Sequence, residues 1–179
     1  EGLTVYSEIG THYLVLHKDA WKINVPLRDR STHEALWQAL ASGAIDCIGS
    51  DHVAHTRTRE SMETGNVWTT ISGFPSRVEG MLPMMLSEGV NKGRISIERL
   101  AQVASENPAR IFGLYPKKGV IVPGADADLI VVDLKRRAKI KKDLLHTVTP
   151  WSVSTVKTSP SSSRSSRSSE RTVKVLARH

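Results

Sequence analysis

The sequence predicts an α/β protein in which strands and helices alternate, and three observations support this class. The apolar run at residues 44–48 is short, rich in small and β-branched side chains, and bounded by turn-forming residues, as a buried strand is. A segment whose apolar residues have helical spacing, 32–42, precedes it. Polar residues follow it at once, and in parallel α/β proteins the carboxyl ends of strands carry the functional groups. These residues are Asp51, His52 and His55. The alternative is a helix cap at this point with two surface histidines.

The first half of the chain contains two further predicted elements. Residues 3–7 have the composition of a strand. Residues 32–42 are predicted as a helix that Ser31 or Thr32 can cap and that Gly43 is placed to end. Its apolar stripe consists of Leu36, Trp37 and Leu40.

The second half is predicted to be mainly helical. Residues 77–88 form one helix with an apolar face, and Ser96 opens another. Pro108 either breaks that helix or lies in the first turn of a further helix at residues 109–112.

Two stretches differ from this pattern. Residues 51–70 are long and polar, and long loops in compact domains are usually functional or disordered. Residues 119–134 return to a β pattern, in which 129–132 is the clearest strand of the chain.

Four segments, in the same order, resemble the cyclic amidohydrolases, the family of dihydroorotases, hydantoinases and allantoinases. Residues 48–56 are similar to the family's Ser-Asp-His-Ala-Pro-His segment, although Ala54 stands in place of the proline. The other three resemblances lie at residues 11–14 with 24–28, at 73–75 with 78–83, and at 105–114 with 118–119 and 123–129. The resemblance covers residues 1–151.

This resemblance implies the last two βα units of a (β/α)8 barrel at residues 1–115, followed by a returning edge of a small β-sandwich at residues 116–151. A complete barrel needs about 250 residues, and this chain has 179. The chain starts at Glu1 without a start methionine, and a strand pattern follows immediately. We therefore expect it to begin within a barrel domain.

The resemblance assigns the main catalytic role to Asp51. The matching aspartate of the family ends the eighth strand, contacts the metal centre and takes a proton from the bridging water. A metal lowers the pKa of its bound water, and a neighbouring carboxylate can pass the proton to the leaving amide nitrogen. Asp51 is therefore the predicted catalytic residue and a predicted metal ligand.

The resemblance implies substrate contacts for four further residues. His55 matches the dihydroorotase histidine that binds the substrate carboxylate. Asn24 matches the residue that contacts the cyclic amide ring, and Ser72 and Gly73 match the second substrate loop, where glycine lets the backbone approach a ligand. His52 is expected to support or pack against the site, and His12 to lie in the core or at the rim.

The family's binuclear zinc site also needs a His-x-His pair, a bridging Lys or Asp, and two further histidines. All of these precede Glu1 in the family's order, and one aspartate cannot hold zinc. The chain alone is therefore expected to be inactive. Two functions stay open, namely hydrolysis of a cyclic amide of the dihydroorotase or hydantoinase type, and a non-catalytic assembly protein or truncated gene product with the same fold.

Composition limits the location and the partners. Cys47 is the single cysteine, so no internal disulfide can form, and a reducing, cytoplasmic location is expected. No apolar run approaches the roughly 20 residues that span a membrane. A small cyclic amide is the expected substrate, and the full-length protein is expected to be a homo-oligomer.

The tail, residues 152–179, is Ser/Arg-rich and carries six Lys or Arg against one Glu, so it holds +5 of the formal net charge of +7. It is expected to be disordered or the product of a shifted reading frame. A basic tail that binds nucleic acid is the alternative, and a nucleic acid is not the expected partner.

Overall fold

The structure is a computed structural model of the 179-residue chain. It describes residues 2–20, 23, 25–53, 66, 77–135 and 146. The tail at residues 152–179 and most of the polar segment at 51–70 lie outside these residues, so the expectations for them stay untested.

A parallel pair of strands forms the centre of the described structure. Strand β1 (Glu8–Gly10) pairs with β2 (Cys47–Gly49) in the register Glu8–Cys47, Ile9–Ile48 and Gly10–Gly49. The predicted buried strand at residues 44–48 is therefore confirmed, although it begins three residues later and ends one residue later than expected. Cys47 is buried within it, and burial, together with the charges of Glu8 and Asp46, raises the pKa of its thiol.

The strand predicted at residues 3–7 was placed too early. Leu3 and Val5 are 86% and 82% exposed. A strand needs a partner for its backbone N–H and C=O groups. The first residue of this segment that has such a partner is Ser7. The Ser7 carbonyl accepts hydrogen bonds from the backbone N–H groups of Asp46 (3.0 Å) and Cys47 (3.2 Å). The paired strand therefore starts where the partner does.

Helix α1 (Ser31–Ser42) connects the two strands and confirms the helix predicted here. The predicted cap by Ser31 or Thr32 is wrong, because the helix begins at Ser31 after Arg30 and no side chain caps it. Its buried residues are Trp37 and Leu40, both on the predicted apolar stripe. Gly43 follows it with φ +91°, the left-handed conformation that ends helices and that glycine adopts without strain. A short 3₁₀ turn, η1 (Thr11–Leu14), follows β1 and lies against α1, where the Trp37 indole N–H donates to the Leu14 carbonyl (3.1 Å).

A helical layer follows at residues 77–111. Helix α2 (Arg77–Met84) continues into the π-helical turn η3 (Met85–Val90), so the predicted helix at 77–88 is confirmed. Gly89 in η3 leaves room for the Trp37 ring, because a Cβ there would lie 2.9 Å from it.

The last helices form one stretch, α3 (Ile97–Ala101), the π-helical turn η4 (Gln102–Glu106) and α4 (Asn107–Ile111). The Ser96 hydroxyl caps α3 by accepting from the Arg99 N–H (3.1 Å). Pro108 lies in the first turn of α4, which is the second of the two predicted alternatives. Proline has no N–H to donate to the preceding turn, and the Asn107 N–H before it bonds to the Gln102 carbonyl, five residues back.

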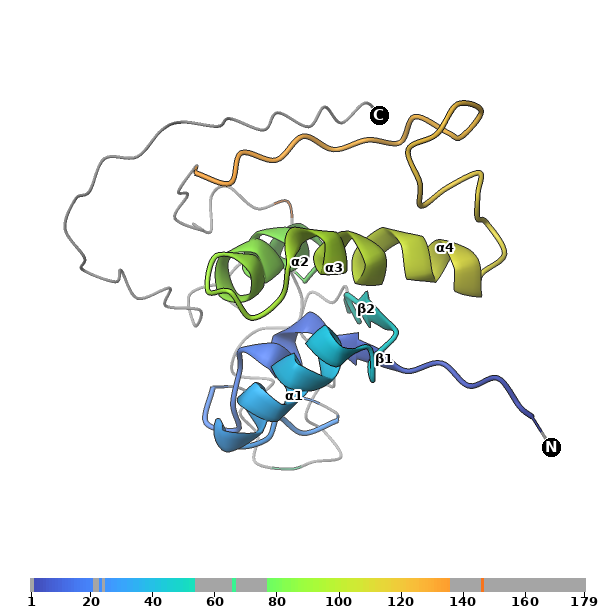
Figure 1. Cartoon of the computed structure of the whole chain (residues 1–179). Helices are drawn as coiled ribbons and strands as arrows, with labels where there is room; N and C mark the ends of the chain where they lie inside the picture. Colours follow the sequence, from blue (N-terminus) through green and yellow to red (C-terminus); the bar gives the residue numbers. More distant parts are fainter. Residues whose placement is uncertain are drawn as a thin grey trace.

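The main core lies between the sheet and these helices. Figure 1 shows α1 on one side of the two strands and the stretch from α3 to α4 on the other. One cluster of buried apolar side chains joins these elements. It consists of Ile9, Leu14, Trp37, Leu40, Ile48, Met85, Ile95, Leu100 and Val103.

After α4 the chain runs back along the helices as an extended segment (Figure 1). Gly119 packs tightly against the helices, since a Cβ there would lie 2.7 Å from Ala109 Cβ and 3.1 Å from Glu106 Cα. Lys118 forms ion pairs with Asp126 (3.0 Å) and Asp128.

The strand predicted at residues 129–132, the returning edge of a β-sandwich, is not formed. Leu129 and Ile130 are 37% and 49% exposed. Within the described ranges no other strand pairs with this stretch, and an apolar β pattern makes a strand only when a partner supplies the ladder hydrogen bonds.

None of the helices that the structure describes has the length and apolar character that crossing a membrane requires.

Candidate active site

Strand β2 leads directly to the predicted catalytic residue. Asp51 lies two residues beyond Gly49, is exposed, and has φ +45°. A left-handed conformation is uncommon for residues other than glycine, and such strained residues cluster at active sites. The structure therefore places Asp51 at the carboxyl end of a parallel strand, as predicted, and the alternative of a helix cap is wrong because no helix begins within the described residues 50–53.

Two glycines shape the end of the sheet beside Asp51. Gly10 and Gly49 are register partners at the carboxyl ends of β1 and β2. A Cβ at Gly10 would overlap the His12 ring, and one at Gly49 would overlap the Glu8 carboxylate. Because neither glycine has a side chain, the His12 ring can lie against Gly10 and the Glu8 carboxylate against Gly49. Sequence reasoning missed Glu8, because only the pairing of β1 with β2 brings its carboxylate next to Gly49.

The two histidines near this end have different environments. His12 is 2% exposed, which confirms the expected core or rim position. His52 is exposed, so the packing role expected for it is not observed, and its backbone N–H donates to the Ser50 hydroxyl (3.3 Å).

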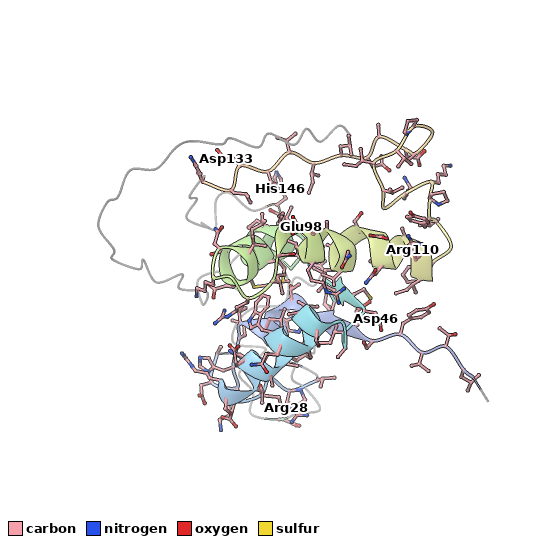
Figure 2. All side chains as sticks on the ribbon, viewed as in Figure 1. Arg28, Asp46, Glu98, Arg110, Asp133 and His146 are labelled. Atoms are coloured by element: carbon pink, nitrogen blue, oxygen red, sulfur yellow. The ribbon has the colours of Figure 1, made fainter. Side chains whose placement is uncertain are left out.

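At the other end of β2, polar contacts converge on Asp46. The Ser7 N–H and hydroxyl donate to Asp46 Oδ2 at 2.7 Å and 3.0 Å. The N–H bond, then the hydroxyl bond and the Arg99 charge, lower the pKa of the Asp46 carboxyl. Asn107 donates from its side-chain amide to the Asp46 carbonyl (2.6 Å). Figure 2 shows Asp46 at the sheet, beside the helix that carries Arg110. Sequence reasoning did not detect this cluster.

The predicted substrate residues cannot be placed. Asn24, His55, Ser72 and Gly73 lie outside the described residues, and their roles stay predictions.

The zinc prediction has only partial support in the donor set. Asp51 offers an exposed carboxylate, and carboxylate oxygen is a suitable zinc donor. The part of the chain that the structure describes contains no group of three or more His, Cys, Asp or Glu side chains that could hold a metal ion. These residues by themselves do not fit a zinc site.

Known proteins resemble this chain over most of its length. The model of the Amidohydrolase family matches residues 3–162. An L-hydantoinase from Paenarthrobacter aurescens is 40% identical over 147 residues, which is 78% of this chain and 32% of the relative. A dihydroorotase from Halobacterium salinarum is 38% identical over 151 residues, 80% of this chain and 34% of the relative. The chain thus spans about a third of the length of the curated relatives it matches.

The solved structures agree with these matches. The L-hydantoinase (dihydropyrimidinase) from Arthrobacter aurescens superposes with a TM-score of 0.63 at 41% identity, covering 72% of this chain and 31% of that one. A dihydropyrimidinase from Brevibacillus agri gives a TM-score of 0.63 at 30% identity, covering 72% and 32%. The chain is an α/β piece of this fold, and it belongs to the amidohydrolase family.

Proposed function

We propose that this chain is the C-terminal part of the barrel of a metal-dependent hydrolase that opens the C–N bond of a cyclic amide. The relatives are named hydantoinase, dihydropyrimidinase and dihydroorotase, whose common chemistry is opening a cyclic amide. The observation that carries the proposal is the position of Asp51, at the carboxyl end of a parallel strand and in a left-handed conformation. Barrel enzymes place their reacting groups at this end of the strands.

Asp51 is the residue of this chain that acts in the reaction. Its carboxylate takes the proton of the attacking water and delivers it to the amide nitrogen as the C–N bond breaks. A positioned acid–base group of this kind typically accelerates a reaction by 10²–10⁴-fold. Any zinc would need ligands besides Asp51, from beyond the described residues.

The substrate class depends on His55. A cyclic amide with a carboxylate, as in dihydroorotate, needs a cationic or N–H partner for that group, and an imidazole can supply it. An uncharged ring, as in hydantoin, does not. The chain is 40% identical to the L-hydantoinase and 38% identical to the dihydroorotase, so both kinds of ring are candidate substrates.

Two observations favour an inactive chain as the second candidate. The chain spans about a third of its relatives, and its described residues lack a complete metal-binding group. We therefore propose that the 179 residues alone do not catalyse the reaction and that activity requires the remaining two-thirds of the fold.

A chimera tests the proposal directly. The matching third of the Paenarthrobacter aurescens L-hydantoinase is replaced by the corresponding part of this chain, and ring opening of hydantoin and of dihydroorotate is measured. We expect hydrolysis of at least one ring. The remaining two-thirds of the L-hydantoinase, expressed without this segment, is the control and should be inactive. A folded, metal-loaded chimera that opens neither ring would contradict the proposal.

A further inference from the structure

The apolar pattern of β2 does not fix how this strand lies along β1. The strand has three paired residues, and two neighbours on opposite faces, Cys47 and Ile48, are both apolar and buried. A shift by one residue would exchange the two faces of the strand and would move every following residue by about 3.3 Å. Since Asp51 follows β2 directly, its position depends on this register.

Polar contacts between Ser7 and Asp46 specify the register that the apolar pattern leaves open. Ser7 and Asp46 come immediately before the paired residues Glu8 and Cys47, so they face each other across the two strands. Besides the two bonds to the carboxylate, the Asp46 N–H donates to the Ser7 carbonyl (3.0 Å) and lies 3.2 Å from the Ser7 hydroxyl oxygen. Four contacts thus join one residue of each strand.

Side chains from the helices also bind the residues just before β2. Asn107 donates to the Asp46 carbonyl (2.6 Å), and Arg99 donates to the Ile45 carbonyl (2.9 Å) and to the Leu40 carbonyl (2.8 Å) at the end of α1. These hydrogen bonds lie before the amino end of β2 and not at its carboxyl end. Their effect on the site must therefore pass through the strand.

A shift of β2 by two residues along β1 is also energetically unfavourable. Side chains alternate along a strand, so Asp46 shares a face with Ile48, and Ser7 with Ile9. Ile9 and Ile48 are both in the core cluster. Moving β2 by two residues along β1 would place the Asp46 carboxylate beside Ile9 or Ile48 beside Ser7, and a half-buried carboxylate without its donors is costly.

We propose that Asp46 is a positioning residue for Asp51, and that its contacts with Ser7 and Asn107 hold β2 in the register that presents Asp51 at the end of the strand. The register role stands on the contacts alone. The consequence for catalysis rests on the proposed function.

Disulfide trapping tests the register in the full chain. Cys47 is the only cysteine, so Glu8→Cys allows a single intramolecular disulfide, between register partners, and the spacing of neighbouring strands suits such a bond. We expect this disulfide under mild oxidation, and no comparable yield from Tyr6→Cys, two residues away on the same face. Adding Asp46→Ala should lower the Glu8→Cys yield to that of the Tyr6→Cys control. Asp46→Asn keeps an acceptor for Ser7 and should restore it.

Loss of stability alone is excluded by a matched variant. Leu100→Ala removes a core side chain, which destabilises the fold but leaves Ser7, Asp46 and Asn107 in place. Yields are compared at equal folded fraction by circular dichroism. An Asp46→Ala chain that forms the disulfide as well as the parent, or a Leu100→Ala chain that loses it equally, overturns the register role.

Kinetics in the chimera test the consequence. Asp46→Ala should lower kcat by roughly ten- to a hundredfold per folded molecule, because a misplacement of about 1 Å can cost that much. KM should change little, and Asp46→Asn should stay near the parent. An unchanged kcat with Asp46→Ala overturns the positioning of Asp51. A chimera that is inactive with Asp46 intact, while the trapping results hold, contradicts the proposed function and leaves the register role supported.

Discussion

At the scale of single residues, two glycines with the same backbone conformation have different neighbours. Gly119 and Gly113 have φ +83° and +69°, so both are strained for any other residue. A Cβ at Gly119 would meet Ala109 and the backbone of η4, whereas nothing lies within 4 Å of one at Gly113. Both glycines have a left-handed backbone, but only Gly119 is crowded. Comparing their alanine variants therefore separates the cost of backbone strain from the cost of crowding.

We predict that Gly119→Ala destabilises the fold more than Gly113→Ala does. Gly113→Ala costs only the left-handed backbone, about 1 kcal/mol. Gly119→Ala adds overpacking of roughly 1–3 kcal/mol. Urea unfolding of the two variants measures the difference. Equal losses would show that the segment after α4 does not pack against the helices as described.

A second residue-scale prediction concerns His55 in the chimera. A charge-assisted hydrogen bond to a substrate carboxylate contributes roughly 1.5–3 kcal/mol. His55→Ala should therefore lower kcat/KM for a carboxylated ring by about ten- to a hundredfold, and leave hydantoin nearly unaffected. Equal losses on both substrates would mean that His55 only shapes the loop after Asp51.

At the scale of elements, stability at acidic pH depends on the junction of β1 and β2. The Ser7 donors and the Arg99 charge lower the pKa of Asp46 in the folded chain. A lowered pKa means that this stabilisation is fully present above the unfolded value of about 3.9 and is lost as the pH falls through the lower folded value.

We predict that Asp46→Asn flattens the dependence of stability on pH in the acidic range. The parent should lose stability as the pH falls below about 3.9 and through the lower folded value, and the variant, which has no charge to titrate there, should lose less. Urea midpoints across this range measure it. Asp126, whose pKa Lys118 lowers, provides a comparison, since Asp126→Asn removes a different carboxylate of the same kind. Identical pH profiles for the parent and Asp46→Asn would contradict the role of the Ser7 bonds.

Elements with local signals could be predicted from the sequence. Gly43 and Ser96 mark a helix end and a helix start through their own backbone and side chain, and both were found in place. Strand positions depend on a partner distant in the sequence. The strand at residues 3–7 was therefore misplaced, and the apolar run at 129–132 formed no strand. The Asp46 contacts join residues 39 and 61 positions apart, which no local pattern could show.

For the candidate site, sequence reasoning found Asp51 through its resemblance to a family motif, and the structure added its left-handed backbone. Glu8 and His12 could not be assigned to the same end of the sheet beforehand. Their placement depends on the register of Gly10 with Gly49 and on the absence of side chains there.

At the scale of the whole molecule, large apolar side chains remain on the surface. The most exposed are Leu3, Val5, Ile121 and Phe112, at 86%, 82%, 82% and 73%. Such surface promotes association, as do unpaired strand edges. Relatives three times as long have additional chain that could cover these residues.

We predict that the folded 179-residue chain self-associates when expressed alone. Sedimentation at several concentrations measures this. Replacing Leu3 and Val5 by serine is expected to reduce association without loss of the core, because neither side chain is in the core cluster. A monomer with a sharp thermal transition that does not depend on concentration would contradict this prediction.

In the proposed function this chain supplies the acid–base residue of a cyclic amide hydrolase, and the kinetics of Asp51→Asn in the chimera provide the sharpest test. His52→Asn is the matched control, because His52 is the adjacent residue, is also exposed and is not proposed to act in the reaction. We expect Asp51→Asn to lose about a hundredfold or more in kcat, with KM within a few-fold of the parent, while His52→Asn remains active. Activity of Asp51→Asn within a few-fold of the parent would contradict the proposed function.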